Sequence, residues 1–396
     1  MPRIAAIAFA AALLAFAMTN LDPWPPQQPV ANPSDAALAD LVRPGQPGFA
    51  LLLRYRGGLT IQRSYGVRDL RSKTLIDAST NFRLASFTKQ FTAMAIMLLV
   101  HDGKLRYDQN LASIWPEFPD YGKSITVRQL LNHTSGLPDY EDLMEAEERS
   151  HGPRWSAEKQ IQDEEAFALL KAETHPKFAP GTSWAYSNSG YVLLGLVVAK
   201  ISGASYPEFL RARIFAPLHM DQTIVYVKGK NEVSNRAYGH TSDAGIFRET
   251  DQSSTSATLG DGGIYSNLLD LAKWDDALRN HTLLSAKDMQ PALTPAKLSD
   301  GSQPHWPAEP GDENLHPGKP VSYGFGWFLD PYKVPGTPES ATLHSRMYHT
   351  GTTVGFRTVI ERFTQQPLTV IVLCNRTDLD PQTLAHKIAD DYPPLK

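Results

Sequence analysis

The sequence predicts an α+β fold: a five-stranded antiparallel sheet flanked by helices, with an inserted, mainly helical subdomain over about residues 110–298. Two observations support this prediction. Strand-like apolar segments occur near both ends of the chain, and the residues between them follow helical patterns. Strands at both ends with helices between them indicate one sheet assembled from the two termini. The cleft between the sheet and the helical subdomain is then the natural place for a ligand.

Length and composition agree with this architecture. The chain has 396 residues, which suits one large domain or two subdomains. Hydrophobic residues make up 42% of the chain, within the usual range for a globular protein. The formal net charge of −4 gives no electrostatic attraction to nucleic acid or to anionic lipid, so we expect no nucleic-acid partner.

The folded part begins with a hairpin and a helix. Residues 48–55 and 59–67 are apolar-rich segments joined through Gly57 and Gly58, a pattern typical of a β-hairpin. A helix follows from Ser86 to near His101, with Gly103 available as a left-handed cap. Its apolar side chains recur with the spacing of a buried helix face: Phe87, Phe91, Met94, Ala95, Leu98 and Leu99.

Helix caps, a loop and apolar runs indicate the elements in the middle and at the end of the chain. Residues 190–202 form an apolar helix that Gly203 stops. The side chains that can cap other helices are Thr126 with Gln129, Ser205 with Glu208, and Ser266. Residues 299–320 are rich in Pro, Gly, Asp and Glu, which is typical of a surface loop. The elements expected after this loop are strands over 323–329, 346–349, 356–363 and 368–374, then a helix near 381–391.

The N-terminus has the pattern of an export signal. Arg3 is followed by a run from Ile4 to Ala17 that is almost entirely apolar and shorter than the roughly 20 residues needed to cross a bilayer. We therefore expect a signal peptide over residues 1–17, cleaved after Ala17, and a periplasmic or secreted protein. An uncleaved membrane anchor is the alternative, and only then would the protein contact a membrane. Residues 18–35 form a Pro-rich linker, and one folded domain is expected over residues 36–396.

Cysteine and histidine usage disfavours two other kinds of site. Cys374 is the single cysteine, so it cannot form an internal disulfide. Its apolar neighbours indicate a small core residue rather than a nucleophile. The twelve histidines show no metal-ligand spacing such as His-Glu-x-x-His, so we expect neither a metal nor a cofactor.

The strongest chemical signal is the tetrapeptide from Ser86 to Lys89, at the head of the apolar helix. Residues three apart share a helix face, so Lys89 can reach the Ser86 oxygen. A serine hydroxyl is a weak nucleophile until a base takes its proton, and burial favours the neutral amine of a lysine. The pair is therefore a candidate nucleophile and base. The alternative is that Ser86 only caps the helix while Lys89 extends outward to solvent.

A second copy of the pattern occurs from Ser156 to Lys159. The run that follows Ser156 contains no apolar face that would desolvate Lys159. We interpret this copy as a solvated helix start, with Ser156 at most an N-cap.

Two more motifs lie downstream. Tyr186-Ser187-Asn188 precedes the 190–202 helix, where a phenol can shuttle protons and an amide can position a carbonyl. The alternative is that Ser187 or Asn188 is an ordinary N-cap, and a similar triplet begins at Tyr265. His349-Thr350-Gly351 follows a strand-like run, and Gly351 would let a substrate backbone approach that strand closely. Its alternative is an ordinary turn at a strand end.

In this order and near this spacing, the three motifs resemble those of serine β-lactamases and penicillin-binding hydrolases. The tyrosine in the second motif is similar to class C β-lactamases and their DD-peptidase and esterase relatives. The resemblance implies a DD-peptidase/β-lactamase-like fold and covers roughly residues 48–375. The other stretches that match are 130–137, 262–266, 323–327 and 355–357. Because Tyr265 falls in one of these, the resemblance leaves Tyr186 as the catalytic tyrosine.

The resemblance also implies roles for individual residues. Ser86 attacks a carbonyl carbon and forms an acyl-enzyme, while Lys89 and Tyr186 relay protons. The backbone N–H groups of Ser86 and Thr352 hold the oxyanion. Asn188 binds a substrate amide oxygen. The residues that line the carboxylate side of the pocket are His349, Thr350 and Thr352, beside Gly351.

One departure from the family pattern bears on the substrate. Many β-lactamases carry Lys in the third motif, whereas this chain has His349, which is neutral over much of the physiological pH range. Histidine there resembles some DD-carboxypeptidases and D-amino-acid peptidases. We therefore rank a D-Ala-D-Ala carboxypeptidase, peptidase or esterase above a class C-type β-lactamase, and a non-turnover penicillin-binding sensor below both. The expected substrate is a peptidoglycan-like peptide, an ester or a β-lactam. Arg357 is a weaker candidate for the missing positive charge.

Overall fold

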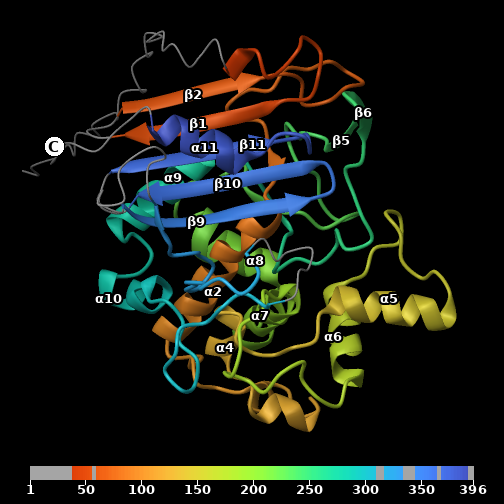
Figure 1. The fold of residues 1–396 in the computed structure, drawn as a ribbon, viewed down its shortest axis with the longest axis vertical. Coiled ribbons are helices and arrows are strands. Elements are labelled where there is room, and N and C mark those ends of the chain that lie inside the picture. Colours follow the sequence, from red (N-terminus) through yellow and green to blue (C-terminus); the bar gives the residue numbers. More distant parts are fainter. Residues whose placement is uncertain (1–37, 56–58, 309–315, 333–343, 364–366, 391–396) are drawn as a thin grey trace, which may run out of the picture.

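Strands from both ends of the chain meet in one antiparallel sheet (Figure 1). The structure is a computed structural model that describes residues 38–55, 59–308, 316–332, 344–363 and 367–390. Strand β1 pairs with β11, so that Phe49 lies opposite Cys374. The order across the sheet is β2 (Leu59–Tyr65), β1 (Phe49–Tyr55), β11 (Leu368–Cys374), β10 (Phe356–Phe363), β9 (His344–Thr353) and β8 (Pro331–Tyr332).

The sheet has six described strands rather than the expected five, because the two-residue strand β8 adds to the edge of β9. The strand expected over residues 323–329 does not form. Gly326 has a left-handed φ of +76°, and the Gly324 N–H donates to the Trp327 carbonyl 2.8 Å away, which folds the segment into a tight turn. The expected hairpin turn at residues 56–58, the signal peptide over 1–17 and the linker over 18–35 lie outside the described residues.

The two faces of the sheet bury different layers, as the alternation of a strand requires. On β1, Phe49, Leu51 and Leu53 pack toward α11 (Pro381–Asp390), the expected final helix. Ala50 and Leu52 face the larger core, which contains helices α2 (Lys89–His101) and α9 (Leu268–Asn280). The sheet is therefore covered on both sides.

A buried ionic cluster attaches α9 to the sheet. Asp275 of α9 has a fully buried side chain. Its carboxylate lies 2.9 Å from Arg54 of β1, 2.8 Å from Arg362 of β10 and 3.3 Å from Arg279 of α9. Burial alone would raise the pKa of Asp275, and the three guanidinium groups overcome this effect and lower it.

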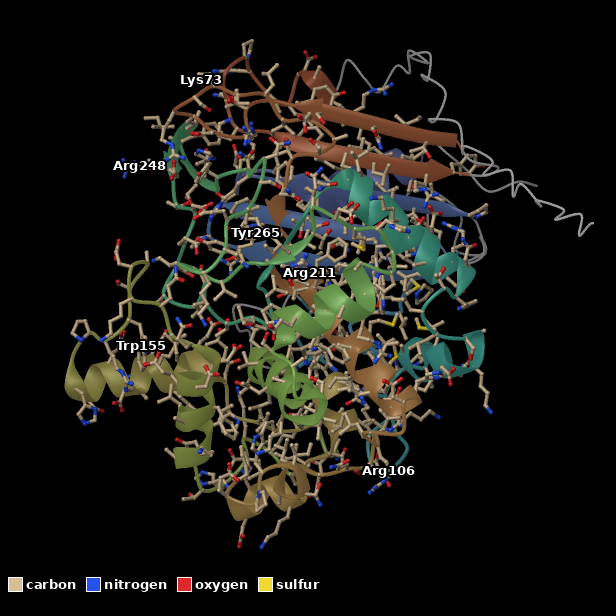
Figure 2. All side chains as sticks on the ribbon, turned by 180° about the vertical axis from the view of Figure 1, so that it is seen from behind. Lys73, Arg106, Trp155, Arg211, Arg248 and Tyr265 are labelled. Atoms are coloured by element: carbon tan, nitrogen blue, oxygen red, sulfur yellow. The ribbon has the colours of Figure 1, made fainter. Side chains whose placement is uncertain are left out.

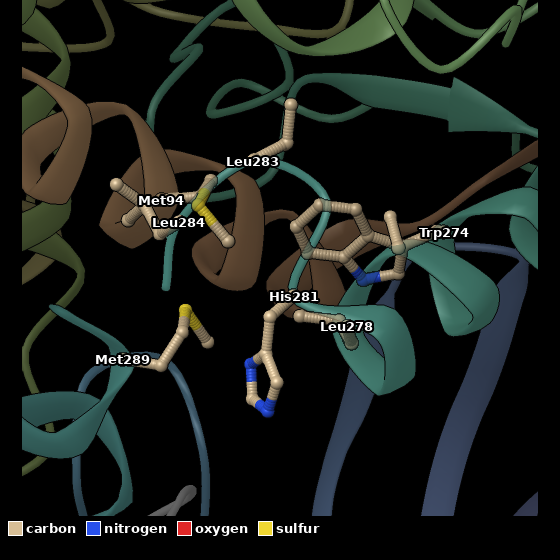
Figure 3. A pocket seen from close by; sticks show the side chains of 8 residues that line it. Met94, Trp274, Leu278, His281, Leu283, Leu284 and Met289 are labelled. Carbon is tan, nitrogen blue, oxygen red and sulfur yellow. The ribbon is translucent and has the colours of Figure 1, made fainter. Parts of the chain in front are cut away.

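Helix α2 crosses the centre of the molecule. Every residue from Lys89 to Leu99 is buried, and Gly103 follows the helix with a φ of +69°, as expected for its cap. Figure 3 shows a small hollow beside this helix, where Met94 faces Trp274 and Met289. The hollow has no room for a water molecule, so it is a packing gap and not a ligand site.

Helices are the main regular secondary structure of the region between the two sets of strands. The capping boxes at Thr126 and Ser205 are present, and Gly203 ends α7 with a φ of +75°. Asn267, and not Ser266, caps α9, because Ser266 is the last residue of a strand. The remaining helices longer than one turn are α4 (Val127–Leu131), α5 (Tyr140–His151), α6 (Asp163–Ala172), α7 (Asn188–Ser202) and α8 (Tyr206–Leu210).

The helical region also contains short strands that the sequence did not indicate. Strands β3 (Phe82–Arg83), β7 (Ile264–Ser266) and β4 (Ile224–Val225) form a small sheet, and β5 (His240–Asp243) pairs with β6 (Ile246–Glu249). Strand β3 leads directly into the segment that carries Ser86. Within the described ranges no single helix is long and apolar enough to cross a bilayer, and one pair bent by 77°, α7 with residues 206–215, passes that test jointly.

Candidate active site

Ser86 is presented by a strained turn between β3 and α2. It lies in a one-turn 3₁₀ helix, Ala85–Thr88, and it is the one residue between positions 81 and 99 that is not buried. Ala85, immediately before it, has a left-handed φ of +49°, a conformation that costs a non-glycine residue about 1 kcal/mol. The Leu84 N–H donates to the Ile264 carbonyl, 2.8 Å away, which ties the turn to β7. Strain at this position is typical of a functional turn.

Lys89 is buried with its amine directed at Ser86. Its Nζ donates to Ser86 Oγ at 3.0 Å, to Asn188 Oδ1 at 2.8 Å and to the main-chain oxygen of Asp261 at 3.2 Å. The residue is 0% exposed, so it does not extend to solvent. The side chain of Ser86 does not cap α2, whose N-cap is Thr88. The geometry that the spacing predicts is therefore present.

The second motif meets the first through both of its outer residues. The ring centroid of Tyr186 lies 4.8 Å from Lys89 Nζ, and the Asn188 amide oxygen accepts a hydrogen bond from the same amine. Ser187 is the N-cap of α7 and accepts the Gly190 N–H at 3.0 Å. The Asn188 Nδ2 group faces Glu141 Oε1 at 3.4 Å. Helix α7 thus positions the motif beside Ser86.

The second Ser-x-x-Lys copy and the triplet that begins at Tyr265 both lie away from Ser86. Ser156 and Lys159 are exposed in a loop, and the next helix begins only at Asp163, so the expectation of a helix start at Ser156 is wrong. Tyr265, labelled in Figure 2, is buried in β7, where its hydroxyl accepts from Arg236 at 2.9 Å. Burial raises the pKa of Tyr265 to about 12. Neither pattern reaches Lys89 or Ser86 in the described contacts.

His349 lies behind the site rather than in the wall of the cavity. It is 1% exposed, its Nδ1 lies 2.7 Å from the Thr350 carbonyl and its Nε2 lies 2.9 Å from the Tyr323 hydroxyl. A carbonyl only accepts, so we assign the proton to Nδ1 and the acceptor role to Nε2. Burial and the nearby Lys89 lower the pKa of His349 to about 3. This histidine is therefore a neutral support for the strand.

Gly351 serves a different contact from the one expected. A Cβ at this position would lie 2.1 Å from the Leu84 carbonyl oxygen and 2.3 Å from Thr358 Oγ1. The glycine therefore lets the chain's own backbone before Ser86 approach β9, where we expected the backbone of a substrate. The Thr358 hydroxyl donates to the same Leu84 oxygen at 2.9 Å. The third motif and the turn that carries Ser86 are thereby held together.

A polar cavity of about 350 Å³ opens beside Ser86. Of the residues that the sequence singled out, Ser86, Asn188 and Thr352 line it, whereas Thr350 and Gly351 are not part of its wall. Hydroxyl groups dominate the other lining side chains, and three of them are charged. We expected residues 139–151 to help shape the pocket, and Tyr140 and Glu141 of that range line it. The other polar lining residues, which the sequence did not single out, are Arg83, Ser253, Ser254, Thr255, Thr258, Asp261 and Thr353.

The charged groups of the cavity come from three segments. Arg83 belongs to β3, Glu141 follows the Asp139 cap of α5, and Asp261 follows Gly260. Arg83 is buried, and its Nη2 donates to the Ser256 carbonyl at 2.9 Å. Arg83 could have been found from its place three residues before Ser86. Among the described residues no group of three or more His, Cys, Asp or Glu side chains is arranged to hold a metal ion.

Arg357 lies on the outer side of the third motif. Its Nη1 donates to the carbonyls of Thr353 and Phe356, at 2.7 and 2.8 Å. Burial lowers the pKa of this guanidinium. The side chain supports the turn between β9 and β10, and it does not line the cavity where a positive charge was sought. Cys374 is buried against the α11 layer, and burial raises the pKa of its thiol, as expected of a core residue.

These features define the class of the protein. A serine hydroxyl that accepts a hydrogen bond from a buried amine, at the wall of a polar cavity between a sheet and helices, is the site of a serine hydrolase. The chain belongs to the beta-lactamase family, whose model matches residues 34–392.

Two curated relatives and two solved structures show how far the similarity extends. Penicillin-binding protein 4* of Bacillus subtilis (strain 168) is 30% identical over 334 residues, which is 81% of this chain and 66% of that protein. Protein flp of Staphylococcus aureus (strain MRSA252) is 29% identical over 205 residues, 51% of this chain and 39% of that protein. The chain thus spans less than two thirds of either relative.

Among solved structures, an octameric penicillin-binding protein homologue from Pyrococcus abyssi superposes with a TM-score of 0.69 at 25% identity, covering 88% of this chain and 73% of that one. D-amino acid amidase from Ochrobactrum anthropi SV3, complexed with L-phenylalanine amide, gives a TM-score of 0.67 at 25% identity, covering 87% and 90%. Both matches agree with the observed fold.

Proposed function

We propose that this protein hydrolyses amide or ester bonds in small polar substrates through an acyl-enzyme on Ser86, and that peptides or amides containing D-amino acids suit it best. The contact between Lys89 Nζ and Ser86 Oγ, 3.0 Å long and buried on the lysine side, carries the proposal. As an ammonium, Nζ can donate to all three of its oxygen neighbours; once it has lost one proton it can accept the Ser86 hydroxyl proton across the same contact, and burial favours that loss.

The other residues of the site supply the remaining steps. Ser86 Oγ forms a bond to the substrate carbonyl carbon, and its proton passes to Lys89 and Tyr186 and then to the leaving amine or alcohol. The backbone N–H groups of Ser86 and Thr352 are the proposed oxyanion donors, and such a pair is worth several kcal/mol. Asn188 binds the substrate amide. A water molecule then breaks the acyl bond with the same residues acting as base and acid.

Three observations favour a peptidase or amidase over a β-lactamase. His349 is buried and neutral, so the third motif offers no cation to a β-lactam carboxylate. The cavity is lined mainly by hydroxyl groups, which suits a short polar acyl group better than a long apolar one. Glu141 at the cavity wall favours a substrate with a free amino group. The similarity to D-amino acid amidase supports this substrate class.

A substrate panel tests the proposal. We would assay D-alanyl-D-alanine peptides, D-amino acid amides, p-nitrophenyl esters and nitrocefin with the native protein, with Ser86→Ala, and with Ser156→Ala as a control outside the site. We expect the highest kcat/KM on a D-amino acid peptide or amide, no turnover by Ser86→Ala, and native rates for Ser156→Ala. Dominant nitrocefin turnover would show a β-lactamase instead. Stable labelling by penicillin with no turnover of any substrate would show a sensor.

We also propose that the protein is exported. The apolar run from Ile4 to Ala17 supports this proposal. Expression of the full chain in a bacterial host, followed by fractionation and N-terminal sequencing, tests it. We expect a mature chain in the periplasm or medium that begins at Met18. A full-length protein in the membrane fraction would show an uncleaved anchor.

A further inference from the structure

His133 lies next to the catalytic tyrosine, and no step of the proposed mechanism uses it. It belongs to the stretch 130–137, where it follows α4. It is 0% exposed and has a left-handed φ of +64°. A buried, strained, non-glycine residue within a catalytic site needs a physical reason, because the conformation costs about 1 kcal/mol.

The backbone around His133 is hydrogen-bonded to the segment that leads into the second motif. The Ala185 N–H donates to the His133 carbonyl at 3.0 Å, and the Gly181 N–H donates to the Thr134 carbonyl at 2.8 Å. These bonds place the segment 181–185 directly along the 133–134 backbone. Both bonds act just after the His133 Cα and help to hold the left-handed conformation at this position.

The ring of His133 makes a specific bond to the motif itself. Its Nδ1 accepts the Ser187 N–H at 3.1 Å, which requires an unprotonated Nδ1 and places the single ring proton on Nε2. Among the described residues Nε2 has no hydrogen-bond partner. The functional nitrogen is therefore Nδ1, and a protonated ring would lose the bond to Ser187.

The same ring packs against the catalytic tyrosine. The ring centroids of His133 and Tyr186 lie 4.5 Å apart with their planes tilted by 35°, and Tyr323 lies at the same centroid distance from His133. Tyr323 is the residue that bonds His349. His133 thus contacts Tyr186 through its ring and Ser187 through its nitrogen, and it links the second motif to the third.

We propose that His133 is a positioning residue: it fixes the phenol of Tyr186 against Lys89 by accepting the Ser187 N–H and by packing on the Tyr186 ring. The proposal rests on the function proposed above. Since Tyr186 lies 4.8 Å from Lys89 by ring centroid to amine, a shift of about 1 Å would disrupt proton transfer and lower the rate about 100-fold. The burial that lowers the pKa of His133 well below its usual value is consistent with this neutral role.

Two substitutions separate the contributions of the nitrogen and the ring. His133→Asn keeps an acceptor near the position of Nδ1 and tolerates the left-handed backbone. His133→Phe keeps a ring against Tyr186 and removes the acceptor. Tyr121→Phe is the matched control, because it deletes a buried hydrogen bond, from Tyr121 to the Leu170 carbonyl, elsewhere in the helical region.

The experiment measures kcat, KM and the pH dependence of kcat/KM on the best substrate of the panel, together with the thermal midpoint. For His133→Phe we expect kcat to fall about 100-fold with KM within about threefold, and a shift in the acidic limb of the pH profile. We expect His133→Asn to recover most of the lost rate. Tyr121→Phe should lose stability without any change in the pH profile. Native kcat in a folded His133→Phe protein would overturn the proposal.

A second measurement on the native protein covers the case in which His133→Phe does not fold. Nitrogen-15 NMR of labelled histidine reports the tautomer and the protonation state of each ring. We expect His133, assigned by its absence in His133→Asn, to carry its proton on Nε2 and not to titrate between about pH 5 and 8. Titration near pH 6.5 or an Nδ1–H tautomer would overturn the proposal. Failure of the proposed function is distinct, because the native protein would then show no turnover at all.

Discussion

Gly351 and Leu84 meet backbone to backbone, because a Cβ at position 351 would lie 2.1 Å from the Leu84 carbonyl oxygen. Leu84 stands two residues before Ser86, and Gly351 stands one residue before Thr352. The contact therefore fixes the distance between the two backbone N–H groups that we propose as oxyanion donors.

Gly351→Ala should damage catalysis more than stability. The added methyl group must push β9 away from the Ser86 turn, which costs about 1–3 kcal/mol of folding free energy and moves an oxyanion donor. Loss of one such donor lowers kcat about 100-fold to 1,000-fold. Assays of kcat and chemical denaturation measure the two effects separately.

Gly301→Ala is the control for that substitution. Unlike Gly351, Gly301 has a left-handed φ, +84°, and nothing lies within 4 Å of the added Cβ. We expect a stability loss of about 1 kcal/mol and native kcat. Equal kcat values for the two glycine variants would contradict the role assigned to the contact between Gly351 and Leu84.

Replacing Lys89 by methionine should abolish most activity in a folded protein. Methionine fills nearly the same buried volume but cannot take the Ser86 proton, so kcat/KM should fall by about 10²–10⁴-fold. The second Ser-x-x-Lys copy supplies the control: Lys159 is exposed, and Lys159→Met should leave kcat/KM unchanged. Comparable losses in both variants would exclude Lys89 as the base.

The stability of the protein should fall in acid partly because of His349. Its pKa is about 3 in the folded protein and about 6.5 in the unfolded chain. Between these values the unfolded chain binds a proton that the folded protein does not, so the free energy of unfolding decreases as the pH falls below about 6.5. The contribution of His349 to stability is fully present above about pH 6.5. Below that pH it is lost at a rate of at most about 1.4 kcal/mol per pH unit.

Urea denaturation of the native protein and of His349→Gln at pH 7, 6 and 5 isolates this contribution, because glutamine does not titrate. We expect the stability difference between the two proteins to shrink as the pH falls. A difference that stays constant from pH 7 to 5 would show that His349 takes up a proton in the folded state.

The cluster at Asp275 should dominate the attachment of α9 to the sheet. Asp275→Asn leaves three arginines beside an uncharged amide and should cost about 3–5 kcal/mol. The neighbouring Asp276 is half exposed and lies 2.6 Å from Arg54, so Asp276→Asn should cost less than about 1 kcal/mol. Denaturant midpoints measure both, and similar losses would contradict the importance of burial here.

Much of the fold followed from local signals in the sequence. The apolar runs at residues 49–55 and 368–374, the apolar helix after Ser86 and the glycine that ends α7 all predict the elements observed. The strand expected over 323–329 fails because Gly326 adopts a left-handed φ. The edge strand β8 and the strands of the small sheet are only two or three residues long, too short to show a period.

The three motifs of the site could be found in the sequence, whereas the residues that surround and support them could not. The spacing of Ser86 and Lys89 predicts their contact because it is local. The burial of His349 against Tyr323 joins residues 26 positions apart, and the contact of His133 with Ser187 spans 54. Pairings of that kind arise from tertiary packing, which no local pattern encodes. The same holds for Glu141 and Asp261, which reach the cavity from separate segments.

Trapping of a covalent adduct on Ser86 tests the central claim most directly. The native protein, Ser86→Ala and Ser156→Ala would each be incubated with benzylpenicillin and with an activated ester, quenched in acid, digested and analysed by mass spectrometry. The account predicts an acyl group on the peptide that contains Ser86 in the native and Ser156→Ala proteins, and none in Ser86→Ala. An adduct on any other residue, or unchanged labelling of Ser86→Ala, would contradict it.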